Sequence, residues 1–135
     1  MIVVDTNVIA YFYLPGDETT AAEALFRQDS DWVAPLLWQS GLRNVLATQL
    51  RAQRLRLADA QAIQQQAEQL LLQKAFAVDS AEVLRLAAKS GCSAYDCEFV
   101  ALAEYLEIPL VTADQRLVRS FPERAQLLRK VTARP

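Results

Sequence analysis

The sequence contains no histidine, and it has only three glycines and two cysteines among its 135 residues. The absence of histidine excludes Ser-His-Asp and Cys-His nucleophile pairs as well as His-ligated zinc. Because Gly16, Gly41 and Gly91 are far apart, a glycine-rich phosphate-binding loop is excluded too. Any catalysis must therefore use carboxylates, hydroxyls, Lys, Arg, Tyr, Cys or a metal ion held by oxygen ligands.

The two cysteines, Cys92 and Cys97, are too few to form a zinc site on their own. Reduced, structural thiols are the simplest expectation, and a disulfide or a redox role is the alternative. No apolar run reaches the roughly 18 residues that span a bilayer, and the first ten residues lack the basic region of a signal peptide. These features predict a cytoplasmic protein with no membrane partner.

Positive charge is also scarce, because 14 Lys and Arg residues face 16 Asp and Glu residues, for a net charge of −2. A freely acting nucleic-acid binder often carries a strong basic excess. Any nucleic-acid partner must therefore be held by local patches or by a bridging metal. The length and the 53% hydrophobic content fit one domain with an ordinary core. We expect a single domain over residues 1–135, in which residues 129–135 form a loosely held basic tail.

Short apolar segments alternate with helical patterns along the chain. Strands are expected at 2–4, 32–34, 76–78, 108–112 and near 125–128. Helices are expected at 7–13, 17–27 (capped by Asp17), 36–53, 58–73, 80–89, 96–106 and 115–120. This alternation predicts an α/β fold, a three-layer, Rossmann-like domain with a central parallel sheet of four to five strands and helices on both faces.

Two aspartates lie at the ends of predicted strands: Asp5 comes immediately after residues 2–4, and Asp114 comes two positions after residues 108–112. In open α/β sheets, ligands bind beyond the carboxyl ends of the strands, at a topological switch point. The two carboxylates converge if their strands are neighbours. Asp96 begins a helix in the crossover, so it joins them only if the preceding loop brings it there. Each aspartate alone is equally well explained as a helix N-cap.

A cluster of carboxylates suits a hard metal ion. Carboxylates a few ångströms apart repel one another, which raises the pKa of at least one. A divalent cation relieves that repulsion, and Mg²⁺ needs only one or two carboxylates plus a phosphate. Such an ion activates water and stabilises charge on a phosphodiester. The acidic pattern therefore indicates metal-dependent chemistry that requires no histidine.

Three segments resemble the motifs of the PIN domain family. They are Val-Val-Asp5-Thr6-Asn7-Val-Ile, the stretch Ser93-Ala-Tyr-Asp96-Cys-Glu-Phe-Val-Ala-Leu-Ala, and Leu110-Val-Thr112-Ala-Asp114-Gln-Arg-Leu. Small proteins of this type are similar to the VapC-like ribonuclease toxins of toxin–antitoxin pairs. The resemblance implies an endoribonuclease that depends on Mg²⁺ or Mn²⁺, acts on RNA, forms a homodimer and binds a cognate antitoxin over its acidic site.

Carried over to this chain, the resemblance implies that Asp5, Asp96 and Asp114 are the catalytic, metal-binding carboxylates. It also implies that Thr6, Asn7 and Thr112 hold those carboxylates or a water. Arg116 and Arg119 follow Asp114 closely in the sequence and are candidates for RNA contacts.

Position 41 departs from the family pattern. The segment Leu37-Trp-Gln-Ser-Gly41-Leu-Arg-Asn-Val-Leu has glycine where the family has its second acidic residue, a glutamate. Glycine inside a helix costs about 1 kcal/mol relative to alanine, so this residue is unusual for local reasons as well. One reading is a weakened or absent catalytic site, and hence an inactive binding module. The other is a neutral or engineered change, with Glu98 as a remote candidate for compensation.

Two other carboxylate-using families fit less well. A haloacid-dehalogenase-like phosphatase needs a second aspartate two residues after the first, where this chain has Asn7. A receiver domain needs an acidic pair beside Asp5 and a lysine after the last strand, and neither is evident.

Overall fold

The computed structural model describes residues 1–133. Its strands are β1 (Ile2–Val4), β2 (Trp32–Pro35), β3 (Ala75–Phe76), β4 (Leu110–Thr112) and β5 (Ala125–Leu127). They form one parallel sheet in the order β3-β2-β1-β4-β5. Strands β2 and β3 lie on one side of β1, and strands β4 and β5 lie on the other side. The direction of winding therefore changes between β1 and β4, and this is the switch point of the sheet.

The central strands are apolar because both of their faces are covered. Every residue of β1 and β4 is buried, as expected for strands of a parallel sheet between two helical layers. Val4 pairs with Val111 in the register. The Asp5 amide then donates to the Val111 carbonyl at 3.0 Å, so Asp5, the residue after β1, lies beside Thr112, the last residue of β4.

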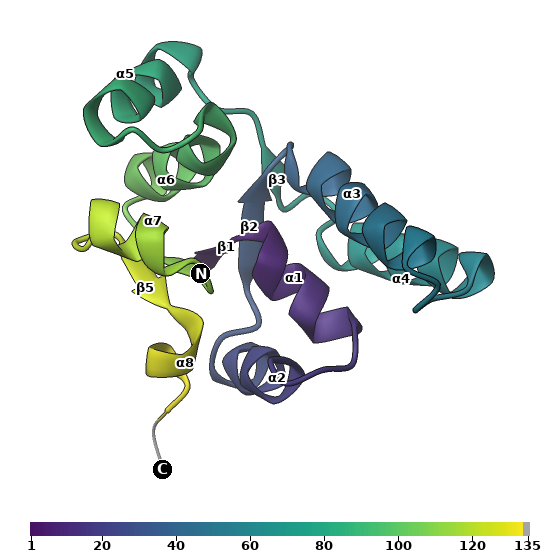
Figure 1. The fold of residues 1–135 in the computed structure, drawn as a ribbon. Coiled ribbons are helices and arrows are strands. Elements are labelled where there is room, and N and C mark those ends of the chain that lie inside the picture. The colour runs from purple at the N-terminus through teal and green to yellow at the C-terminus, as the bar shows by residue number, and fades with distance from the viewer. Residues whose placement is uncertain (134–135) are drawn as a thin grey trace.

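Helices cover both faces of this sheet, which confirms the predicted three-layer α/β fold (Figure 1). They are α1 (Thr6–Tyr13), α2 (Thr19–Gln28), α3 (Trp38–Arg51), α4 (Leu57–Leu70), α5 (Ser80–Ser90), α6 (Ala94–Leu106), α7 (Gln115–Ser120) and α8 (Leu128–Val131). Helix α6 packs against β1, β2 and β4, and α5 packs on α6. Helix α1 lies on the other side, where it contacts α2 and α3 (Figure 1).

Some predicted elements differ from the observed ones. Asp17 does not cap α2, because the helix begins at Thr19 and Glu18 occupies the N-cap position. The strand expected at 76–78 is the shorter β3, which starts one residue earlier and ends at Phe76. Residues 129–131 are not a loose tail but belong to α8, anchored by buried Leu128 and by an ion pair between Arg129 and Glu18. The end of the predicted tail, residues 134–135, lies outside the described residues.

Both cysteines, Cys92 and Cys97, are free and buried, in line with the structural role expected for them. Across residues 1–133, the structure contains no helix that is both long enough and apolar enough to cross a membrane.

Candidate functional site

Asp5 lies at the carboxyl end of β1 and forms the N-cap of α1. Its Oδ1 accepts a hydrogen bond from the Thr6 amide at 2.7 Å, which is the ordinary role of an aspartate that begins a helix. Its Oδ2 faces the neighbouring strand and accepts a hydrogen bond from the Thr112 hydroxyl at 2.7 Å. The side chain is therefore fixed from two sides, and the residue is only 7% exposed.

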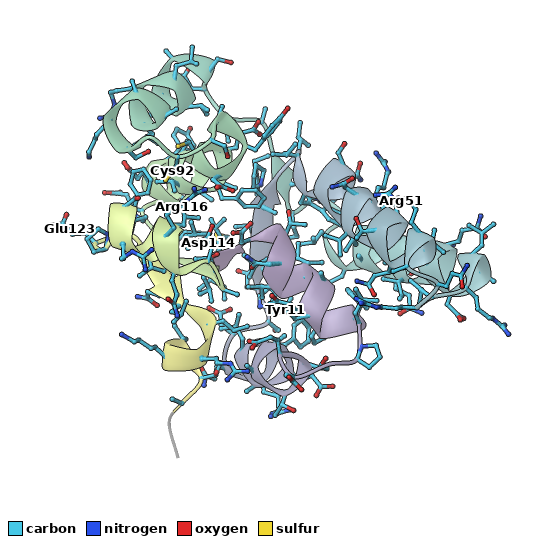
Figure 2. The ribbon with its side chains drawn as sticks, in the orientation of Figure 1. Tyr11, Arg51, Cys92, Asp114, Arg116 and Glu123 are labelled. Atoms are coloured by element: carbon cyan, nitrogen blue, oxygen red, sulfur yellow. The ribbon has the colours of Figure 1, made fainter. Side chains whose placement is uncertain are left out.

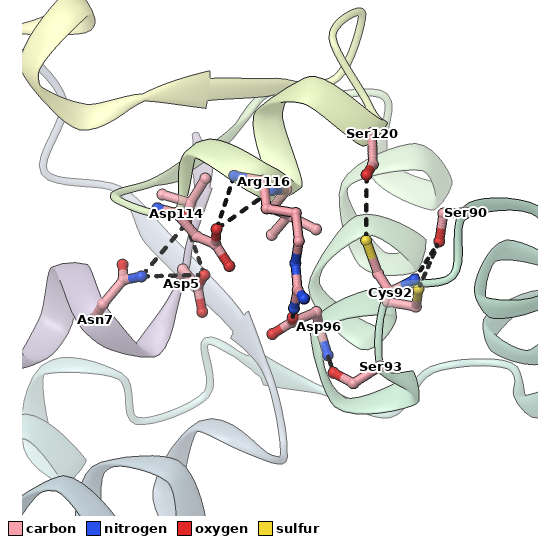
Figure 3. Close-up of polar contacts among 12 residues, drawn as sticks. Asp5, Asn7, Ser90, Cys92, Ser93, Asp96, Asp114, Arg116 and Ser120 are labelled. Carbon is pink, nitrogen blue, oxygen red and sulfur yellow. Dashed lines mark hydrogen bonds and ion pairs between the residues drawn. The ribbon is translucent and has the colours of Figure 1, made fainter.

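Thr112 links the two strand ends. Its fully buried hydroxyl donates to Asp5 and accepts from the Asp114 amide at 3.0 Å. Asn7 adds a second link, because its Nδ2 lies 3.4 Å from both Asp5 Oδ2 and Thr112 Oγ1. Its Oδ1 also accepts from the Ala113 amide at 3.2 Å. Thr112 and Asn7 thus hold Asp5 and the β4–α7 turn in one network (Figure 3).

Asp114 forms the N-cap of α7. Its Oδ1 accepts hydrogen bonds from the amides of Arg116 and Leu117, at 2.9 Å and 3.4 Å. Among the hydrogen bonds of residues 1–133, none uses Asp114 Oδ2. One carboxylate oxygen therefore caps the helix, and the other makes no hydrogen bond within residues 1–133.

Asp96 reaches the same place from α6. Ser93 is the N-cap of that helix, and its hydroxyl accepts from the Asp96 amide at 3.0 Å. The serine-to-aspartate spacing of three residues is the sequence signal for this cap. Asp96 Oδ2 then lies 3.9 Å from a guanidinium nitrogen of Arg116, which reaches back from α7 (Figure 3).

Neighbouring carboxylates contribute to the raised pKa values of both Asp5 and Asp96. Burial, with smaller contributions from Asp96 and Asp114, raises the pKa of Asp5 from 3.8 to about 6, although Thr112 and Thr6 act against the shift. The pKa of Asp96 is also raised, by burial first and then by Asp114, and Ser93 and Arg116 oppose that increase. All three carboxylates lie at helix N-termini, whose partial positive charge lowers the cost of gathering them.

The donor set fits a hard divalent cation that keeps much of its water. The available ligands are carboxylate oxygens, with no histidine in the chain and with both thiols buried. Within the described part of the chain, no three Asp, Glu, Cys or His side chains are grouped closely enough to bind a metal directly. Mg²⁺ commonly uses only one or two carboxylates and completes its shell with water and phosphate. One or two of Asp5, Asp96 and Asp114 would hold such an ion, and water and phosphate would supply its other ligands.

Position 41 also faces this site. Gly41 lies in the first half of α3 and packs against Thr6, the residue after Asp5. A Cβ atom on residue 41 would lie 2.8 Å from Thr6 Oγ1 and 3.0 Å from Thr6 Cγ2. The position where the PIN resemblance implies a glutamate is therefore next to Asp5, and Thr6 fills the space where a side chain on residue 41 would begin.

Two predicted residues are not joined to the cluster. Arg119 is exposed in the last turn of α7, and no ion pair within residues 1–133 connects it to the three aspartates. Glu98 lies one turn into α6, and burial alone raises its pKa, with no contribution from the aspartates.

Comparison with known proteins agrees with this geometry. Residues 2–120 match the PIN domain family. Ribonuclease VapC3 of Pyrobaculum aerophilum is 33% identical over 126 residues, which cover 90% of this chain and 95% of that protein. The crystal structure of PAE2754 from Pyrobaculum aerophilum superposes with a TM-score of 0.78 at 20% identity, covering 98% of this chain and 93% of the other. The crystal structure of FitAcB from Neisseria gonorrhoeae superposes with a TM-score of 0.72 at 17% identity, covering 93% of this chain and 96% of the other.

The fold and the site together define a three-layer α/β protein with an acidic centre at the switch point of its sheet. The sequence match over most of the chain makes the assignment specific: this chain belongs to the PIN domain family.

Proposed function

We propose that this chain is a metal-dependent endoribonuclease of the toxin–antitoxin kind, with Asp5, Asp96 and Asp114 as its catalytic carboxylates. The observation that carries the proposal is the convergence of these side chains from β1, β4 and α6 at one edge of the sheet. The similarity to Ribonuclease VapC3 supports RNA as the substrate. The cofactor is Mg²⁺ or Mn²⁺, which supplies an activated water and stabilises phosphodiester charge when bound.

The chain's own residues orient the acidic groups. Thr112 holds Asp5 and, through the Asp114 amide, fixes the start of α7. Because the pKa of Asp5 is about 6, this group is mostly ionised at neutral pH and gains a proton under mildly acidic conditions. Cation binding therefore weakens as the pH falls through 6, since ligand carboxylates must be deprotonated. Arg116, held beside Asp96, supplies positive charge for an RNA phosphate.

The same proposal includes the partners and the location of the protein. We infer a cognate antitoxin that covers the acidic edge, a homodimer and a cytoplasmic location. The support is family membership together with the near-neutral charge, which leaves RNA binding to the local arginines of α7.

Gly41 favours a second candidate function, that of an inactive binding module. A PIN domain that lacks one acid and packs Thr6 into the vacated space keeps its fold without a full complement of negative charge. Such a protein would still bind its antitoxin but would not cleave RNA.

Cleavage of a broad RNA panel in Mg²⁺, Mn²⁺ and EDTA separates the two candidates. The ribonuclease cuts RNA only with the divalent ions, and Asp5→Asn and Asp114→Asn abolish cleavage. A double variant, Gly41→Glu with Thr6→Ser, tests whether a fourth acid increases the rate. If the wild type and the double variant are both inert while an antitoxin still binds, the binding module replaces the nuclease.

A further inference from the structure

A polar cleft of about 400 Å³ lies beside the acidic site. Its lining includes Tyr11 of α1, Glu18 before α2, Ala113 of the β4–α7 turn, Gln115 at the start of α7, and Arg129 of α8. Helices α2 and α8 pack side by side at this end of the molecule (Figure 1). A volume near the lower end of the roughly 300–1,000 Å³ range of small-molecule sites suits one nucleotide and not a nucleic-acid helix.

The cleft borders the acidic centre through the two sequence neighbours of Asp114. Ala113 and Gln115 stand immediately before and after Asp114. The Ala113 amide is held by Asn7, whose other amide atom lies 3.4 Å from Asp5 Oδ2. Figure 2 labels Tyr11 on α1 and Asp114 at the start of α7, the two elements that border the cleft beside the site. An RNA strand lying on Asp114 therefore has this cleft as its next contact.

Glu18 and Arg129, which both line the cleft, form an ion pair. The Arg129 guanidinium lies 2.5 Å from Glu18 Oε1, and this contact raises the pKa of Arg129. Glu18 occupies the N-cap position of α2, but its side chain makes no capping hydrogen bond. The carboxylate is therefore not needed to begin the helix, and the ion pair with Arg129 holds it at the wall of the cleft.

The combination of groups matches one nucleobase. A carboxylate can only accept hydrogen bonds, so it pairs in a bidentate way with a base edge that presents two adjacent N–H donors. Guanine offers this arrangement at N1 and N2 on its Watson–Crick edge, whereas adenine, cytosine and uracil mix donors with acceptors. An aromatic ring such as that of Tyr11 provides a stacking surface for an unpaired RNA base, and an arginine provides a contact for phosphate.

We propose that this cleft binds a guanine base of the RNA strand beside the scissile phosphodiester. Glu18 accepts the two N–H groups of the base, Tyr11 stacks on its ring and Arg129 faces the adjoining phosphate. The assignment rests on the proposed ribonuclease function and adds to it a base preference and the residues that read the base.

The test measures binding in EDTA, where no metal-dependent cleavage occurs. Fluorescence anisotropy compares a short oligouridine that carries one central guanine with the same strand carrying adenine. We expect the wild type to prefer guanine by about tenfold, the effect of one bidentate pair. Glu18→Gln removes that preference without weakening binding of plain oligouridine. Arg129→Gln weakens the binding of every strand to a similar degree. It also lowers the salt dependence of binding by about one released counterion.

The ion pair between Glu82 and Arg85 on α5 supplies matched controls. Glu82→Gln and Arg85→Gln remove the same charges outside the cleft and should leave the guanine preference unchanged. Two outcomes would overturn the cleft assignment and leave the proposed nuclease function intact. In the first, wild-type protein cuts RNA but shows no guanine preference. In the second, Glu18→Gln and Glu82→Gln have equal effects on the guanine preference. Wild-type protein that neither binds nor cuts any RNA overturns both.

Discussion

The Thr112 hydroxyl donates a 2.7 Å hydrogen bond to Asp5, although 107 positions separate the two residues. The same oxygen accepts from the Asp114 amide, so a single buried side chain sets the positions of two of the three aspartates. Replacing Thr112 should therefore disturb the site more than replacing any exposed residue around it.

Thr112→Val should destabilise the protein by about 1–3 kcal/mol, because it leaves buried polar groups without partners. It should also raise the pKa of Asp5 further, since the Thr112 hydrogen bond now lowers it. Urea unfolding and carboxyl-carbon NMR titration measure the two effects. Thr112→Ser retains the hydroxyl and serves as the control. A Val variant with an unchanged Asp5 titration would contradict the proposed role of Thr112.

Asp5 makes the stability of the metal-free protein depend on pH. Its folded-state pKa is raised from 3.8 to about 6, so the native state binds this proton more tightly than the unfolded chain. The favourable contribution is complete below pH 3.8 and is lost as the pH rises through 6. A pKa shift of that size contributes at most about 3 kcal/mol to the free energy of unfolding.

Asp5→Asn should therefore be more stable than the wild type at pH 7 in EDTA, and this advantage should shrink as the pH falls toward 4. Urea unfolding at a series of pH values provides the measurement. Mn²⁺ should stabilise the wild type and have little effect on the variant. An Asn variant that is less stable than the wild type at neutral pH would exclude this account.

Thr6 and Gly41 should show coupled stability effects. Gly41→Ala gains about 1 kcal/mol of helix propensity, but its Cβ would lie 2.8 Å and 3.0 Å from the two γ atoms of Thr6. Threonine places two γ atoms in three staggered positions, so rotation always leaves at least one of them in contact. Overpacking of this kind typically costs about 1–3 kcal/mol.

Serine has a single γ atom, which can turn to the third position. Gly41→Ala should therefore be neutral or destabilising with Thr6 and stabilising with Thr6→Ser, and a double-mutant cycle measures the difference. Equal effects of Gly41→Ala in the two backgrounds would show that Thr6 does not limit this position.

Arg116 should have opposite effects on metal and RNA binding. Its guanidinium lies 3.9 Å from Asp96, and the side chain is 65% exposed. Arg116→Gln removes a cation that competes for Asp96, so Mn²⁺ affinity in calorimetry should rise by about two- to fivefold, the range of exposed ion pairs. RNA affinity should fall, because one phosphate contact is lost.

Arg119→Gln is the companion variant. Arg119 is on the same helix but has no ion pair with Asp96 among the described residues. Its loss should reduce RNA affinity without a comparable rise in Mn²⁺ affinity. Weaker Mn²⁺ binding by Arg116→Gln would mean that Arg116 supports the metal site.

The sequence was informative where structure is decided locally. The bounds of α7 agree with the prediction, because Asp114 begins that helix with its own side chain. The positions of Asp5 and Asp114 at strand ends follow from two apolar runs and the general rule for parallel sheets. Ser93 and Asp96 show the spacing of an N-cap, although the sequence alone did not say where that helix start would lie.

The features that were missed depend on contacts between distant segments. Arg129 looked like the beginning of a tail and Leu128 like the end of a strand, yet the burial of Leu128 and the ion pair of Arg129 with Glu18 make both residues part of α8. The close approach of Thr6 to Gly41 depends on the packing distance between α1 and α3, which local propensity does not determine. The cleft beside Asp114 has no local signal either, because its lining comes from four separate parts of the chain.

The separation of Asp5 from Thr112 also has a consequence during synthesis. Asp5 emerges from the ribosome 107 residues before Thr112, and Asp114 follows Thr112 by two residues. Domains generally fold as units, with N-terminal parts appearing first at about 5–20 residues per second. A nascent or truncated chain that lacks β4 has neither the partner of Asp5 nor the third acid. The acidic centre therefore cannot assemble beside the ribosome until translation of this domain is nearly complete.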